Sequence, residues 1–121
     1  MVSYRWQEDP TEDAMSLFAK LSELRAVKTQ DSAGTDELSI SRADGFQFKA
    51  VSMCQGDVVD LDRLLPFDGQ LEIVLREVDA RTDEMQDVGS IFIRSDELGR
   101  GELTQQFSGA GALYDLTYKV I

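Results

Sequence analysis

The segment Ala112-Leu-Tyr-Asp-Leu-Thr-Tyr-Lys-Val120 decides the fold class of this chain. Its apolar residues occupy every second position, with polar residues between them. Side chains of a β-strand point alternately to two faces, so this pattern predicts a strand with one buried and one exposed face. Tyr114 and Tyr118 fall on the apolar face, where we expect them to pack in a core.

Similar short apolar segments recur along the chain, separated by turn residues at intervals of roughly 8 to 12 residues. The pair Asp44-Gly45, which stands between two such segments, is typical of a hairpin turn. Together these features predict an all-β fold, an antiparallel β-sandwich of about eight strands. The segments on which this prediction depends are Leu38–Ile40, Phe46–Phe48, Leu71–Leu75, Val88–Ile93 and Ala112–Val120.

One stretch, Met15–Lys28, is ambiguous. Its leucines fit the apolar stripe of a helix, but they fit a long edge strand equally well. Short helical turns are predicted at Leu61–Leu65 and at Ser95–Leu98, the second with Ser95 as its N-cap residue.

The length of 121 residues suits one domain with its own core. We expect residues 1–14 to form a polar leader and residues 15–121 to form the domain. The sequence has no histidine and one cysteine, which excludes Ser–His and Cys–His catalytic pairs, an internal disulfide and the usual zinc sites. We therefore expect a protein that is not an enzyme. Cys54 is expected to be a small buried residue beside Met53.

The net charge is −11, from 12 basic and 23 acidic residues. Such a surface repels nucleic-acid phosphates and anionic lipids, so we expect no nucleic-acid partner, and a membrane partner only if calcium mediates the contact. The sequence lacks both a signal peptide and the apolar run of roughly 18 residues that a membrane helix needs. A cytoplasmic location is the default expectation, with signal-less export left open.

Acidic residues gather in two predicted loops between strands. One loop is Asp31-Ser-Ala-Gly-Thr-Asp36-Glu37, and the other runs from Glu77 to Asp87 with Arg81 as its one basic residue. Calcium takes about six to eight oxygen ligands, which carboxylates converging from two loops supply. The alternative is that these are solvated turn residues, because Asp, Ser, Gly and Thr are common in turns. The linear EF-hand spacing is absent.

Residues 16–121 resemble a small bacterial version of the C2 domain, the calcium-dependent phospholipid-binding β-sandwich of protein kinase C and synaptotagmin. Asp31, Gly34 and Asp36 match the family's first calcium loop, although its usual Pro-Tyr is replaced by Glu37-Leu38. The resemblance implies a β-sandwich, calcium as the cofactor and a strand at Leu17–Lys28.

The family's third calcium loop is matched in part. Glu77 and Asp79 stand where an Asp pair follows a strand, and Val88-Gly89 resembles the hydrophobic-Gly pair that closes the loop. Two positions depart from the pattern. Glu77 replaces an Asp, and Gln86 stands three residues before the glycine, where the family has its last Asp. The basic cluster with which some C2 domains bind phosphoinositides also has no counterpart.

The sequence therefore predicts a non-catalytic module that binds calcium at one end of a β-sandwich. The alternative is a metal-independent, acidic protein-interaction domain of the inhibitor or immunity type, which docks on a basic partner surface through the same carboxylates. The candidate calcium ligands are Asp31, Asp36, Glu77, Asp79, Asp87 and, in reserve, Asp83.

Overall fold

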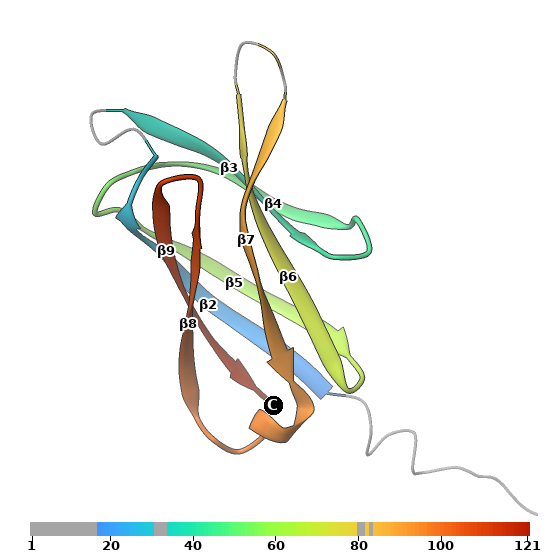
Figure 1. The fold of residues 1–121 in the computed structure, drawn as a ribbon. Helices are drawn as coiled ribbons and strands as arrows, with labels where there is room; N and C mark the ends of the chain where they lie inside the picture. Colours follow the sequence, from blue (N-terminus) through green and yellow to red (C-terminus); the bar gives the residue numbers. More distant parts are fainter. Residues whose placement is uncertain (1–16, 31–33, 80–81, 83) are drawn as a thin grey trace, which may run out of the picture.

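A computed structural model describes residues 17–30, 34–79, 82 and 84–121. Figure 1 shows the strands that these residues form. The elements are β2 (Leu17–Lys28), β3 (Thr35–Arg42), β4 (Gln47–Cys54), β5 (Val58–Phe67), β6 (Gln70–Val78), β7 (Met85–Arg94), the 3-10 helix η1 (Ser95–Glu97), β8 (Glu102–Gly109) and β9 (Ala112–Val120). The predicted leader, residues 1–14, lies outside the described residues.

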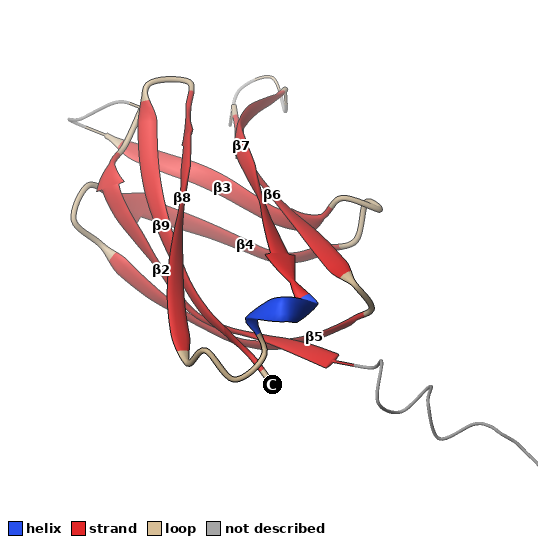
Figure 2. Cartoon of the chain, turned by 60° about the horizontal axis from the view of Figure 1, so that its bottom comes forward, coloured by secondary structure: helices blue, strands red, loops and turns tan. Residues whose placement is uncertain are grey.

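The strands form two four-stranded antiparallel sheets, with the orders β5-β2-β9-β8 and β4-β3-β6-β7. The sheets face each other across the core in Figures 1 and 2. The predicted antiparallel β-sandwich of about eight strands is confirmed. Within the described ranges, no helix is long and apolar enough to cross a membrane.

The core lies between the two sheets and includes the apolar face of β9. This strand is central in its sheet, between β2 and β8, and its inward residues are at most 2% exposed. Full burial of a leucine-sized side chain stabilises a fold by about 1.5–3 kcal/mol relative to exposure. The prediction that Tyr114 and Tyr118 pack in the core is confirmed. The inward residues of β9 are Ala112, Tyr114, Leu116, Tyr118 and Val120.

The ambiguous stretch forms strand β2, as the family resemblance implied, but β2 is not an edge strand. It pairs with β5 on one side and with β9 on the other. The pairing register of β2 shifts between Leu21 and Glu23 on both sides, which marks a β-bulge. An extra residue in the strand brings side chains three positions apart to the same face, so Leu21 and Leu24 are both fully buried. The bulge explains the helix-like spacing.

Of the two predicted helical turns, the one at Leu61–Leu65 is wrong. These residues belong to β5. Residues four apart share a face in a strand as well as in a helix, and Leu61 and Leu65 are both buried. The turn after β7 is confirmed as η1, but its N-cap residue is Arg94 instead of Ser95. The backbone N–H of Arg94 donates to Glu97 Oε1 at 3.0 Å.

The expectation that Cys54 is buried is also wrong. Met53 points into the core and is fully buried, and the next side chain of a strand points to the other face. Cys54 is therefore exposed. Its sulfur lies 3.2 Å from the hydroxyl oxygen of Thr35.

The edge strands β7 and β8, one from each sheet, meet along one side of the sandwich. Gly109 makes this approach possible, because a Cβ at this position would overlap the carbonyl oxygen of Val88. Further along, the Gln105 side-chain amide donates to the carbonyl of Phe92 at 2.6 Å. These contacts fix β7, and with it the start of that strand, against the opposite sheet.

Candidate functional site

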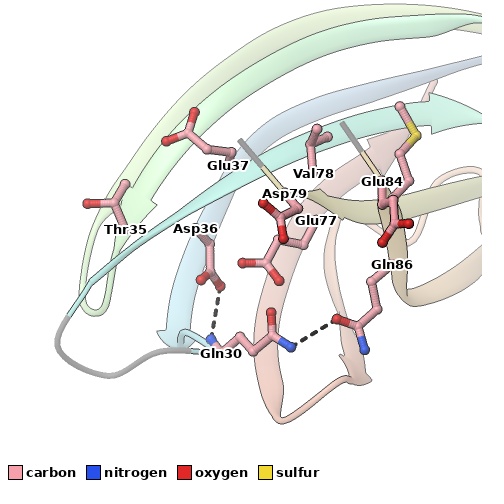
Figure 3. Close-up of a pocket in the computed structure, with 10 residues that line it drawn as sticks. Gln30, Thr35, Asp36, Glu37, Glu77, Val78, Asp79, Glu84 and Gln86 are labelled. Atoms are coloured by element: carbon pink, nitrogen blue, oxygen red, sulfur yellow. Dashed lines mark hydrogen bonds between the residues drawn. The ribbon is translucent and has the colours of Figure 1, made fainter. Parts of the chain in front are cut away.

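A pocket of about 790 Å³ lies at one end of the sandwich, where β3 begins, β6 ends and β7 begins. Figure 3 shows its lining residues. Half of them are acidic, and two more carry side-chain amides. The lining consists of Gln30, Thr35, Asp36, Glu37, Glu77, Val78, Asp79, Glu84, Met85 and Gln86.

Asp36 is the most deeply buried acid of the pocket, with 1% of its surface exposed. It lies on the inward face of β3, in line with the core residues Leu38 and Ile40. Its Oδ2 accepts a hydrogen bond from the Tyr114 hydroxyl at 2.6 Å and another from the backbone N–H of Gln30 at 3.0 Å. Its Oδ1 is buried and has no hydrogen-bond partner among the residues that the structure describes. An unsatisfied buried carboxylate oxygen costs stability unless a ligand or ordered water satisfies it.

Gln30 connects three walls of the pocket. Besides its backbone bond to Asp36, its side-chain nitrogen lies 2.9 Å from Gln86 Oε1. With the Gln30 amide turned by 180°, its nitrogen donates instead to the Glu77 carboxylate. Figure 3 shows the Gln30 side chain extending from Asp36 past Glu77 toward Gln86. An amide that sits among carboxylates in this way can offer either hydrogens or an oxygen to the pocket.

The remaining acids come from the ends of β6 and β7. Glu77 continues the inward-facing row of Ile73 and Leu75, so a carboxylate stands where the apolar row reaches the pocket. Asp79 follows the strand, and its backbone N–H donates to the carbonyl of Glu84 at 2.8 Å. This bond brings the Asp79 and Glu84 side chains to the same hairpin end, where both line the pocket.

The structure brings together three of the six predicted calcium ligands, namely Asp36, Glu77 and Asp79. Asp87 is not among the pocket-lining residues. It lies opposite Arg76 in the ladder and accepts a bond from its Nε at 2.8 Å. Asp31 and Asp83 lie outside the described residues.

Within the described residues, no group of three or more Asp, Glu, His or Cys side chains is close enough to hold a metal ion as it stands. The pocket thus supplies oxygen donors of the type that calcium uses. Their present positions do not form a closed coordination site.

Tyr114 does not line the pocket itself but supports Asp36 from the opposite sheet, through the hydrogen bond of its hydroxyl to Oδ2. It is fully buried. Burial, the hydrogen bond to Asp36 and the negative charges of Asp36 and Glu77 all raise the pKa of its hydroxyl above the ordinary value. The hydroxyl therefore keeps its proton and remains a donor to Asp36 over the whole physiological range.

Sequence reasoning missed three residues of the site. Glu84 belongs to the acidic loop and could have been selected from that cluster. Gln30 and Tyr114 carry no such signal, because a lone Gln after a strand and a Tyr in an apolar row are ordinary residues in those places.

No protein-family model matches the sequence, and a search of curated proteins finds no match. Solved structures with a similar fold do exist. One is a C2 domain of a plant extended synaptotagmin 1, with 9% identity and a TM-score of 0.50, over 88% of this chain and 95% of that one.

Another is human GIVD cytosolic phospholipase A2, in complex with methyl gamma-linolenyl fluorophosphonate inhibitor and terbium chloride. It has 17% identity and a TM-score of 0.50, over 87% of this chain. This chain spans only 17% of the phospholipase chain. At these identities the likeness concerns the fold, which is a C2-like β-sandwich.

Proposed function

On this C2-like scaffold, we propose that the chain is a non-catalytic binding module that holds calcium in the acidic pocket. The protein ligands would be Asp36, Glu77 and Asp79. Asp87 is left out because its carboxylate pairs with Arg76 outside the pocket lining.

The observation that carries the proposal is the free Oδ1 of Asp36. Within the described part of the chain, this oxygen is buried and has no hydrogen-bond partner, while the other oxygen of the same carboxylate has two donors. A negative charge in such a place is costly unless something positive or hydrogen-bonding meets it. A cation in the pocket would satisfy this oxygen directly.

The donors around Asp36 favour calcium over other metals. They are carboxylate and amide oxygens, and the sequence has no histidine for zinc or copper. Calcium accepts irregular geometry with about six to eight oxygens, including water, whereas magnesium demands a near-ideal octahedron. Terbium, present in the human phospholipase complex, is also a cation that takes oxygen ligands.

The same pocket offers little for catalysis. The chain has no histidine, and its one cysteine is not among the pocket-lining residues. We therefore assign the site to binding, in which a bound ion would stiffen the ends of β3, β6 and β7.

The test is a calorimetric titration of chelator-treated protein with Ca²⁺ and Mg²⁺, together with thermal unfolding. For a Kd of about 1 mM, 10 mM free calcium adds about 1.4 kcal/mol of stability by linkage. That gain raises the melting temperature by about 5 °C. Asp36→Asn and Asp79→Asn should each remove most of this shift. The amide oxygen of an asparagine at position 36 would still accept the bonds from Tyr114 and Gln30, so the fold is expected to survive.

Asp87→Asn is the matched control, since it removes the same charge near the start of β7 but outside the pocket lining. This variant should keep the calcium effect. If wild-type protein shows neither heat of binding nor a thermal shift, the calcium proposal is wrong. The metal-independent interaction domain then becomes the leading explanation of the acidic pocket.

A further inference from the structure

Resting on the proposed calcium function, we infer that Tyr114 is a positioning residue for the cation site. It holds the Asp36 carboxylate through Oδ2 and leaves Oδ1 for the ion, although Tyr114 would not itself touch the ion.

Among the described residues, the hydrogen bonds of the Asp36 side chain are all on one oxygen. Oδ2 receives the Tyr114 hydroxyl from β9 and the Gln30 backbone N–H from the segment after β2. Donors from two separate elements fix the rotation of the carboxylate group. The other oxygen, Oδ1, is held in place without a donor of its own among the described residues, and a bound cation would satisfy it.

The support comes from a rigid part of the molecule. Tyr114 lies in the middle of its sheet, opposite Ala26 of β2 and Phe107 of β8, and all three residues are buried. The bond to Asp36 spans the core between the sheets and joins residues 78 positions apart in the chain. A phenol held on both sides by strands is a fixed donor, and fixed outer partners of metal ligands govern affinity.

A purely structural role for the hydroxyl is the rival explanation, and the same strand provides a control for it. Tyr118 lies on the same face of β9, is equally buried, and donates to a carboxylate, that of Glu97. Glu97 belongs to η1 and is not among the pocket-lining residues. Tyr118→Phe therefore removes a comparable buried hydroxyl without touching the site.

Removal of the Tyr114 hydroxyl has two opposing effects on calcium affinity. The Asp36 carboxylate would carry slightly more charge, which favours binding, but it would be free to rotate, which disfavours binding. Loss of an outer-shell partner typically weakens metal affinity by about 10- to 100-fold, so we expect the second effect to dominate.

The experiment is a calcium titration by calorimetry of wild type, Tyr114→Phe and Tyr118→Phe, each with its melting temperature in chelator. Both variants should melt at a lower temperature than wild type. Only Tyr114→Phe should raise the Kd for calcium, by about tenfold or more. Equal affinities of Tyr114→Phe and wild type, or a tighter variant, would overturn the inference. If wild-type protein does not bind calcium at all, the proposed calcium function is wrong, which is a different outcome from a wrong role for Tyr114.

A second measurement guards against a Tyr114→Phe variant that does not fold. In the Tyr118→Phe background, calcium should change the near-ultraviolet absorption of Tyr114, because the ion changes the field at its hydroxyl. A titration that binds calcium without any tyrosine difference spectrum contradicts the inference.

Discussion

A carboxylate buried as completely as that of Asp36 loses its hydration and needs partners in exchange. Tyr114 and Gln30 supply two hydrogen bonds, both to Oδ2. Hydrogen bonds to a charged group contribute about 1.5–3 kcal/mol each, so Asp36 is stabilised on one side only. This asymmetry within a single side chain supports the proposed binding role of the pocket.

The two buried tyrosines make stability sensitive to alkaline pH. The pKa of Tyr114 and the pKa of Tyr118 are both raised in the folded state, mainly by burial. The unfolded chain then loses these protons near its ordinary pKa of about 10, while the folded chain retains them. The stability that each tyrosine contributes is therefore complete below about pH 10 and is lost as pH rises above it.

Urea unfolding between pH 8 and pH 11 measures this effect. Above pH 10, each tyrosine should lower the free energy of unfolding by up to about 1.4 kcal/mol per pH unit. Tyr114→Phe and Tyr118→Phe should each make the free energy of unfolding fall less steeply with pH than it does in wild type, when the proteins are compared at every pH. An unchanged slope in both variants would show that neither hydroxyl is retained in its protonated form by the fold.

At the level of single residues, the sequence predicts which acidic residues belong to the site but not which residues contact them. Asp36, Glu77 and Asp79 were identified from their place in two loops, and the structure brings them to one pocket. Tyr114 was predicted only as a core residue, because the bond to Asp36 depends on how two sheets pack. Periodicity along one strand carries no information on which carboxylate lies across the core.

Among the elements, the strands were predicted well where alternation was uninterrupted. β9 and the hairpin of β3 and β4 follow from pattern and turn residues alone. β2 could not be assigned from periodicity, because the bulge between Leu21 and Glu23 imitates helical spacing. Likewise, Leu61 and Leu65 share a face in either type of element. Bulges depend on pairing with neighbouring strands, which a local pattern does not contain.

The contact of β7 with β8 depends on a position without a side chain. Gly109→Ala would place a Cβ on the carbonyl oxygen of Val88 and push the two sheets apart. Replacing glycine stabilises the folded state by about 0.4–1 kcal/mol through the unfolded chain when the site is free of strain. The overlap should outweigh this gain, since forced overpacking costs about 1–3 kcal/mol.

Chemical denaturation should therefore show a lower free energy of unfolding for Gly109→Ala, by about 1–2 kcal/mol net. Ser108→Ala, at the exposed neighbouring position, is the control and should change stability little. A Gly109→Ala variant as stable as wild type would mean that β7 and β8 separate freely.

For the whole molecule, the pocket is assembled from parts that are distant in sequence. Gln30 follows β2, Asp36 lies at the start of β3 and Glu77 lies at the end of β6. Tyr114, which supports Asp36 from behind the pocket, comes from β9. The net charge of −11 does not say where the acidic residues lie, whereas the fold places five of them around one pocket. The sequence places these acidic residues in two loops. That the two loops lie at the same end of the sandwich follows from the two-sheet topology, which the sequence pattern does not contain.

The hydrogen bond between Tyr114 and Asp36 also bears on the time course of folding. Contacts between residues so far apart form late, after the entropy of closing a long loop has been lost. A cation that needs this bond cannot assist the early encounter of strands, and it can only act on the finished sandwich.

We therefore expect calcium to slow unfolding and to leave the refolding rate nearly unchanged, so that in stopped-flow denaturant jumps only the unfolding limb of the chevron moves. A refolding limb accelerated by calcium would mean that the pocket forms before the transition state. With an unmoved refolding limb, the ion prolongs the lifetime of the folded state without hastening its formation.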